Sequence, residues 1–515
     1  MQGPVVDQPA EPDASSPTTE GSAIAPASKS VPGGSRELLT LALPLIVSQS
    51  FMTVQVFIDS LLLSWHDARE MAATLPAMLW FWQLFGLLQV TAGYVSTFVA
   101  QYTGANRPHR VGPAVWQGIW FAVVAGLLFL LMVPLAPYLI KLGGHTLELQ
   151  QFETTYLRCL SFAALPMLVM AAVNGFFSGR GQTWTILLIE GAGTAVNVSL
   201  ALVFVFGEAG VPKLGLPGIP GIPDGGIAAA GWCTVAGSWV SAAVAVGLFV
   251  RKKYRIEFAS LSGWRFDKPL FKRLVRFGGP AGMQVFQDVM VFNIFVLAVG
   301  ALGNAAAGAT SLAIRLNMVA FLPMMGMAQA VCILVGQRLG GNRPEIAEKT
   351  TFTGMKWMFG YILLVACVYL FLPYTLVAVF EGDREIDNFR EVAALVPSLL
   401  VCVALYSLAE APMMAFAFSL RGAGDTRFVS LVTFALGWPL MVFPTVGVLL
   451  LYLYGSWPWG LDTALYTAWG SATAYIFVMA VCFWLRHRTG KWKTMRVIEP
   501  TPVDDPDAEP KPLAA

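Results

Sequence analysis

The stretch "VAQYTGANRP" (Val99–Pro108) returns, little changed, as "VGQRLGGNRP" (Val335–Pro344). The two copies lie 236 positions apart, and so do Pro44 and Pro280, which stand in the apolar runs "LALPLIVSQ" and "FGGPAGMQV". Turn chemistry alone explains one Gly-Asn-Pro match, but not several landmarks in the same order. The sequence therefore predicts a chain made of two related halves.

A second pair of short stretches supports the duplication. "GRGQT" (Gly179–Thr183) and "GAGDT" (Gly422–Thr426) follow corresponding apolar runs and are 243 positions apart. Each half holds six apolar runs that could each cross a membrane. Because six is an even number, both halves insert into the membrane in the same direction. We therefore expect a pseudo-twofold axis along the membrane normal, as in transporters with parallel repeats.

The composition places the chain in a membrane. It is 56% hydrophobic and only 12% charged, with a mean hydropathy of +0.64, whereas soluble domains carry about 25% charged residues. Crossing the hydrocarbon core takes about 20 apolar residues. The prediction is an all-α polytopic membrane protein of twelve transmembrane helices in two six-helix lobes. The helices start near Leu38, Met71, Val111, Thr155, Thr183, Ile227, Leu270, Ala305, Thr351, Asp387, Phe428 and Thr463.

The remaining segments complete the predicted organisation. Residues 1–35 and 491–515 are rich in Pro, Ala and polar residues, and we expect disordered tails there. Between them lie an N-lobe at 36–250, a basic linker at 251–269 and a C-lobe at 270–490. The connections that share a side with the termini carry most of the Lys and Arg, so the positive-inside rule puts both termini in the cytoplasm. These charges serve topology and lipid contact, and nothing calls for nucleic acid.

Three acidic residues interrupt the apolar runs. A charge at the bilayer centre costs about 2.5–3.5 kcal/mol on insertion scales, so such residues need compensation or a function. Each has a polar neighbour four positions earlier on the same helix face, which gives the pairs Gln55–Asp59, Gln284–Asp288 and Tyr406–Glu410. These acids could hold helices together as protonated or paired side chains. Alternatively, they could reversibly bind a proton or a hard cation such as Na⁺.

Other polar or soft residues in the runs are less specific. Met413 and Met414, next to Pro412, could offer an adaptable surface to varied ligands or simply pack. Glu190 and Arg315 could serve structure or function, and the Pro- and Gly-rich loop Val211–Gly226 has no assigned role.

At this point the sequence resembles the multidrug and toxic compound extrusion (MATE) family, most closely its NorM-type bacterial branch. The resemblance covers about residues 36–490. It rests on six motifs in the family's order: "LALPLIVSQSFMTVQVFIDS", "VAQYTGANRP", "AVNVSLALVFVFG", "GGPAGMQVFQDV", "FLPMMGMAQAVCILVGQRLG" and "YSLAEAPMMAFAFSLRGAGDT".

The resemblance implies export of cationic, amphipathic compounds by antiport against Na⁺ or H⁺. Asp288 and Glu410 match acidic cation-binding positions of the second lobe, and Tyr406 matches an aromatic residue beside that cation. Asp59 matches the acid of the first lobe, and Asn197 a polar position on the fifth span. Two departures from the family pattern concern the coupling ion. Ala201 stands where the family often has Asp or Asn. At positions 288 and 410, Asp and Glu stand in the reverse of the common NorM arrangement.

The sequence-based hypothesis is an inner-membrane, monomeric multidrug antiporter without a cofactor. Asp288, Glu410, Tyr406 and Asp59 would bind the coupling cation, with Na⁺ possible at Asp288 and Glu410. The substrate cavity would be lined by Gln55, Gln284, Asn197, Met413 and Met414. The alternative is a flippase for lipid-linked oligosaccharides or lipids, which would prefer a cationic cavity. An enzyme is not expected, because the four histidines are scattered and no nucleophile motif is present.

Overall fold

The computed structural model describes residues 31–378 and 389–500, and every regular element in these two ranges is helical. Twelve helical segments are long and apolar enough to cross a membrane. The chain is therefore an all-α, multi-pass membrane protein, as the composition predicts. The tenth span begins at Phe389, and its expected start at Asp387 lies outside the described residues.

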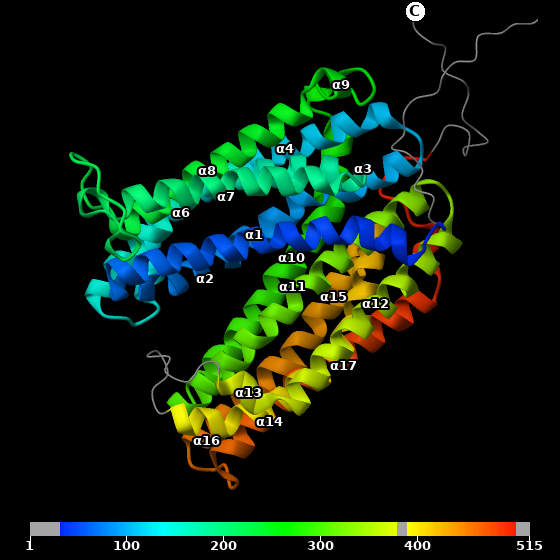
Figure 1. Cartoon of the computed structure of the whole chain (residues 1–515). Helices are drawn as coiled ribbons and strands as arrows, with labels where there is room; N and C mark the ends of the chain where they lie inside the picture. The colour runs from blue at the N-terminus through cyan, green and yellow to red at the C-terminus, as the bar shows by residue number, and fades with distance from the viewer. Residues whose placement is uncertain (1–30, 379–388, 501–515) are drawn as a thin grey trace, which may run out of the picture.

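The helices form two bundles in chain order (Figure 1). The N-lobe consists of α1 (Ser35–His66), α2 (Ala68–Gly93), α3 (Val95–Gly104), α4 (Val111–Phe129), α5 (Met132–Lys141), α6 (Leu147–Gly179), α7 (Thr183–Phe204) and α8 (Gly226–Phe249). After α9 (Lys252–Arg255), the C-lobe consists of α10 (Lys268–Gly300), α11 (Asn304–Gly340), α12 (Pro344–Phe371), α13 (Pro373–Ala378), α14 (Phe389–Ala423), α15 (Thr426–Gly437), α16 (Phe443–Leu453) and α17 (Gly460–Arg488).

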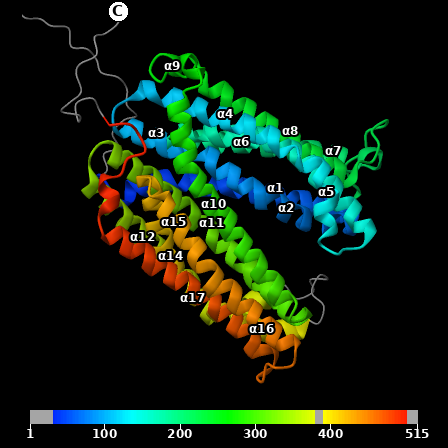
Figure 2. The same ribbon diagram turned by 180° about the vertical axis from the view of Figure 1, so that it is seen from behind.

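The two bundles lie close together at one end and diverge toward the other, as both views show (Figures 1 and 2). The start of α1, the end of α17 and the two repeated loops, which follow α3 and α11, lie at the close end, which we call the junction end. The tips of α5 and α16 lie at the other, open end.

Two hollows on the outer seams between the lobes show the internal symmetry. One, of about 580 Å³, lies between Ile46 of α1 and a face of α11 and α12 that includes Pro323 and Trp357. The other, of about 540 Å³, lies between α10 and a face of α2 and α4 that includes Leu87 and Phe121. The pairs Leu87/Pro323 and Phe121/Trp357 are each 236 positions apart. The duplication read from the loops therefore extends to the packed faces of the spans.

The first repeated loop closes its helix with a left-handed residue. The Arg107 N–H donates to the Tyr102 carbonyl (2.9 Å), a closure over six residues that is typical of helix C-termini. Asn106 has φ 54°, and so does Asn342 in the second loop; Asn tolerates this region better than most residues with a side chain. Pro108 then begins the next helical turn, where a missing N–H costs nothing.

The glycines of the two repeated loops bring the lobes into contact. A Cβ on Gly104 would overlap the carbonyl of Gln337, and a Cβ on Gly340 would overlap the carbonyl of Gln101. Both positions therefore require glycine for the backbones of α3 and α11 to approach this closely. The sequence predicted turns at these loops, and the structure shows that they also form the junction between the lobes.

Two symmetric hydrogen bonds cross that junction. Gln101 Nε2 donates to the Gly422 carbonyl (2.9 Å), and Gln337 Nε2 donates to the Gly179 carbonyl (2.8 Å). The acceptors belong to the second pair of repeated stretches, "GAGDT" and "GRGQT". Each repeat thus supplies a donor and an acceptor to the other lobe. We call this set of contacts the glutamine latch.

The expected tail boundaries need correction. Residues 491–500 were expected to be disordered, but the structure places them against the junction end: Trp492 is fully buried, and Val497 is 1% exposed. Their apolar side chains bury against the helices, which a composition-based reading of the tail overlooks. Likewise, the Gly33 carbonyl accepts a hydrogen bond from Thr353 Oγ1 (3.0 Å). Residues 1–30 and 501–515 lie outside the described part of the chain.

Candidate functional site

The acid of the N-lobe, Asp59 on α1, lies between α7 and α8. It is 6% exposed and lies beside Asn197, which is fully buried, and Thr234. Asn197 Nδ2 donates to Thr234 Oγ1 (3.3 Å). Within the described residues, Asp59 Oδ1 and Asn197 Oδ1 are buried and receive no hydrogen bond. Two such oxygens on neighbouring residues suit a proton or a small hard cation.

Gln55 and Glu190 both lie on the junction-end side of this site. Gln55 Oε1 accepts a hydrogen bond from Thr194 Oγ1 on α7 (3.5 Å) rather than contacting Asp59 as its spacing suggested. Glu190 precedes Asn197 by two helical turns on α7, and its Oε1 accepts from Asn174 Nδ2 on α6 (3.0 Å). The N-lobe therefore holds a second carboxyl in its interior, toward the junction end.

In the C-lobe, Asp288 on α10 is linked to an arginine through an amide. Gln284 Nε2 lies 3.5 Å from Asp288 Oδ2, and Gln284 Oε1 accepts from the Arg421 guanidinium (2.8 Å). Arg421 and Asp288 interact electrostatically. This partly compensates the cost of placing a carboxylate inside the membrane. The expected pairing of Gln284 with Asp288 is present.

The other acid of the C-lobe, Glu410 on α14, lies in an aromatic environment. It is 9% exposed, and its electrostatic neighbours include Tyr406 and Tyr369. The Tyr406 ring stacks on Trp469 of α17 with centroids 6.4 Å apart. No described side chain donates a hydrogen bond to this carboxyl, so it is the least compensated of the three acids.

Asp288 and Glu410 thus have different described neighbours: Gln284 and Arg421 lie near Asp288, whereas Tyr406 and Tyr369 lie near Glu410. Within residues 31–378 and 389–500, no three His, Cys, Asp or Glu side chains come together as metal ligands. A Na⁺ site formed by Asp288 and Glu410 therefore stays a prediction.

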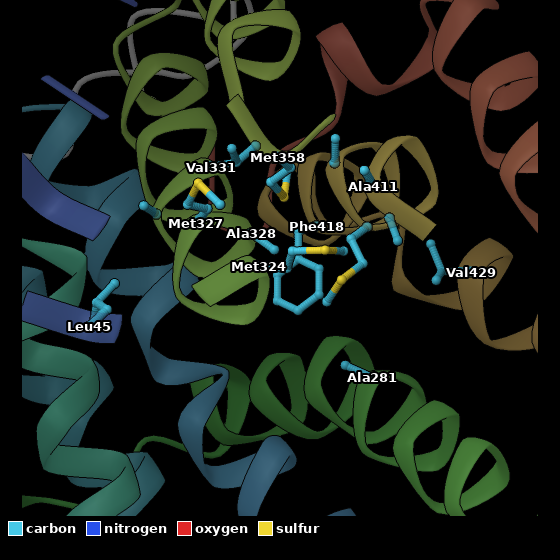
Figure 3. Close-up of a cluster of buried hydrophobic side chains, with 14 of the residues drawn as sticks. Leu45, Ala281, Met324, Met327, Ala328, Val331, Met358, Ala411, Phe418 and Val429 are labelled. Atoms are coloured by element: carbon cyan, nitrogen blue, oxygen red, sulfur yellow. The ribbon is translucent and has the colours of Figure 1, made fainter. Parts of the chain in front are cut away.

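The two candidate methionines differ in their surroundings. Met414 is 4% exposed and belongs to a large hydrophobic cluster that includes residues of both lobes. Met413 is only partly buried against the same core. Figure 3 shows other members of this core, with Met324, Met327 and Met358 grouped near Phe418. This part of the C-lobe is rich in adaptable thioethers.

Sequence reasoning missed two residues that complete the sites. Thr234 joins Asn197 beside Asp59, and its only sequence signal is that of a polar residue in the apolar run "GWCTVAGSW". Arg421 stands in a connection on the side of the termini, where the sequence predicts arginines that set topology. Its side chain instead turns into the lobe, with its guanidinium 4.7 Å from the Phe418 ring centroid. Position in the sequence could not reveal that direction.

The sequence model of the MatE family matches residues 44–203 and 280–444, more than half of the chain. This chain belongs to the MatE family. The two matches begin 236 positions apart, the same spacing as the repeated loops. Membership identifies a multi-pass membrane protein of a transporter family.

Other comparisons agree with a MATE protein. The chain is 25% identical over 410 residues to a protein of Shewanella oneidensis named probable multidrug resistance protein NorM, covering 78% of this chain and 84% of that one. The fold matches a MOP superfamily transporter from Pyrococcus furiosus, with a TM-score of 0.77, 18% identity and coverage of 90% and 97%. It also matches an outward-facing multidrug resistance MATE family transporter, with a TM-score of 0.76, 18% identity and the same coverage.

Proposed function

We propose that this MATE protein is a secondary active multidrug efflux antiporter. It would export cationic amphipathic compounds in exchange for Na⁺ or H⁺ by alternating access of its two lobes. The observation that carries the proposal is the set of buried carboxyls at Asp59, Asp288 and Glu410, which no described lysine or arginine contacts directly. The name of the Shewanella relative supports the substrate class.

The exchange follows from competition for the same charge. An organic cation bound near a buried carboxylate stabilises it, and a proton or Na⁺ arriving from the open end does the same. Binding of one therefore favours release of the other. Asp59 would act with Asn197 in the N-lobe, and Asp288 and Glu410 would act in the C-lobe, with Tyr406 beside Glu410. Gln55, Gln284 and Met413 would contact the substrate.

We place the junction end in the cytoplasm of a bacterial inner membrane, so that the described conformation faces outward. Support comes from the basic residues at this end, including Arg107, Arg110, Arg338 and Arg343, because cytoplasmic loops are enriched in Lys and Arg. Membrane lipids surround the spans, and the protein would work as a monomer.

The second candidate is a flippase for lipid-linked oligosaccharides or lipids. Its supporting observation is Arg421, a cation that points into the C-lobe and could face a pyrophosphate. Four interior carboxyls, counting Glu190, weigh against it, because a pyrophosphate would be repelled by them. We therefore favour the antiporter.

The first prediction tests the carboxyls by dye efflux from proteoliposomes under an imposed Na⁺ or pH gradient, one at a time. Asp59→Asn, Asp288→Asn and Glu410→Gln should each reduce efflux of a cationic dye about tenfold or more, the scale of a lost charge-assisted contact. Asp462→Asn, an exposed acid at the open end, is the matched control and should leave efflux unchanged.

Equal efflux by wild type and all three variants would refute the proposal. The gradient that drives wild-type efflux identifies the coupling ion. Movement of a fluorescent isoprenoid pyrophosphate across the bilayer, without dye efflux, would establish the flippase instead.

A further inference from the structure

The last described residues, 491–500, cross from the C-lobe to the N-lobe at the junction end. We call them the C-terminal strap. Its first turn is anchored on its own lobe: Trp492 stacks on His487 with ring centroids 4.6 Å apart, and Trp492 Nε1 donates to the His487 carbonyl (2.8 Å). Lys493 Nζ lies 2.6 Å from Glu348 Oε2 on α12. The strap therefore starts as a fixed part of the C-lobe.

The middle of the strap contacts the glutamine latch. The Val497 N–H donates to Gln101 Oε1 (2.8 Å), while Gln101 Nε2 donates to the Gly422 carbonyl. One side chain of the N-lobe is thus held from both sides by the C-lobe. Val497 and Ile498 are 1% and 8% exposed, so lifting the strap would expose apolar surface to water.

The end of the strap is bound by a group of basic and phenolic side chains. Glu499 Oε2 accepts from Tyr102 Oη (2.7 Å) and from Arg273 (3.0 Å), and Oε1 accepts from Arg110 Nε (2.9 Å). Arg107 donates to the Glu499 carbonyl oxygen (3.0 Å). Three of these four residues, Tyr102, Arg107 and Arg110, belong to the N-lobe and adjoin the first repeated loop.

We propose that the C-terminal strap is a clasp that holds the junction end closed. It is fixed to the C-lobe by Trp492 and Lys493, and it binds the N-lobe through Gln101 and the Glu499 carboxylate. Separation of the lobes at this end must break these contacts together with the glutamine latch. The strap thereby sets the ratio of the two conformations that the proposed alternating access requires, and the inference rests on that proposed function.

The contacts with the N-lobe distinguish a clasp from a simple tail. If the strap merely covers the C-lobe, loss of its bonds to the N-lobe will not change the distance between the lobes. If it is a clasp, loss of the Glu499 charge will increase the fraction of molecules with a separated junction. The glutamine latch remains in either case, so the effect is a shift and not an all-or-none change.

The experiment measures distances between spin labels in the full chain in lipid nanodiscs, without ligand or ion gradient. Labels are introduced as unnatural amino acids at His109 in the N-lobe and Lys349 in the C-lobe, which are both exposed. Glu499→Gln should raise the ratio of long to short distances about tenfold, because charge-assisted hydrogen bonds are lost. Tyr102→Phe should raise it by a smaller factor.

Glu348→Gln is the matched control, because it removes an ion pair of the strap with its own lobe. It should change the ratio less than Glu499→Gln does. Unchanged distances in Glu499→Gln and Tyr102→Phe, with wild-type melting temperatures, would overturn the clasp. Since no dye or coupling ion is present, this outcome is independent of whether the protein proves to be a drug antiporter.

Discussion

At the scale of single residues, the interior acids differ in what compensates them. Asp59 lies beside neutral amide and hydroxyl groups, Asp288 lies within reach of Arg421 through Gln284, and Glu410 lies among aromatic rings. The three acids therefore differ in the polar groups that can compensate a charge at each position.

Glu499 lies outside the spans, and its surroundings favour the ionised carboxylate. Partial burial of its carboxyl opposes ionisation, but hydrogen bonds from Tyr102 and Arg110 outweigh it, so the pKa of Glu499 is lower than its ordinary value of 4.5. The other charged groups around Glu499 are Arg107 and Arg273. Asp267 lies one step further out, with its Oδ2 3.7 Å from Arg110 Nη1. Its contacts are therefore fully present at neutral pH.

The lowered pKa of Glu499 predicts how the junction responds to pH. A carboxyl with a lowered pKa contributes stability that is present above its ordinary pKa and is lost as the pH falls through the lowered value. The label distances at His109 and Lys349 should not change between pH 7.5 and about pH 5. The junction should separate only below the ordinary carboxyl pKa of 4.5, and less so in Glu499→Gln. A shift centred near pH 6 would contradict the assignment of the clasp to Glu499.

At the scale of elements, the crossing of α3 and α11 depends on two glycines. Gly104 and Gly340 each face a carbonyl of the other lobe, so a methyl group at either position must push the helices apart. Glycine in a helix costs about 0.5–1 kcal/mol relative to alanine. The two glycines are therefore explained by close approach and not by helix formation.

Gly104→Ala and Gly340→Ala should consequently disfavour the closed junction without unfolding either lobe. We expect the long label distance between positions 109 and 349 to dominate in both variants, with dye efflux reduced about tenfold or more. Gly247→Ala on α8 is the control, because a Cβ there has open space. A short label distance in Gly104→Ala would show that the crossing relaxes locally.

At the scale of the whole molecule, two lobes of the same fold meet through equivalent faces. The repeated loops, the glutamine latch and the two seam hollows all come in pairs. The strap is different, because one lobe supplies it and the other binds it. The scaffold is symmetric, while the carboxyls and the clasp are not.

Locking this junction should stop transport. Ala100 Cβ lies 3.1 Å from the position of a Cβ on Gly336 in the other lobe, close to the separation that a disulfide bridges. Ala100→Cys with Gly336→Cys, in a Cys332→Ser background, should lose dye efflux on oxidation and regain it with reductant. Ala100→Cys alone should not respond. Undiminished efflux by the oxidised pair would exclude lobe separation at the junction end.

The sequence by itself determined the membrane class, the twelve helical spans, the duplication and the positions of the buried acids. These properties follow from local signals: the length of apolar runs, Gly and Asn at helix ends, and rare charges inside the runs. Local signals of this kind can be read from the sequence without knowing the fold. The same signals placed "GANRP" and "GGNRP" in turns.

Only the tertiary structure decided what those turns and acids contact. It brought Gly104 against Gln337, turned Arg421 toward Asp288 and laid residues 491–500 across both lobes. The physical reason is that these contacts join residues far apart in the chain. The direction of a side chain depends on which helix faces pack together, and no local pattern specifies a partner hundreds of positions away.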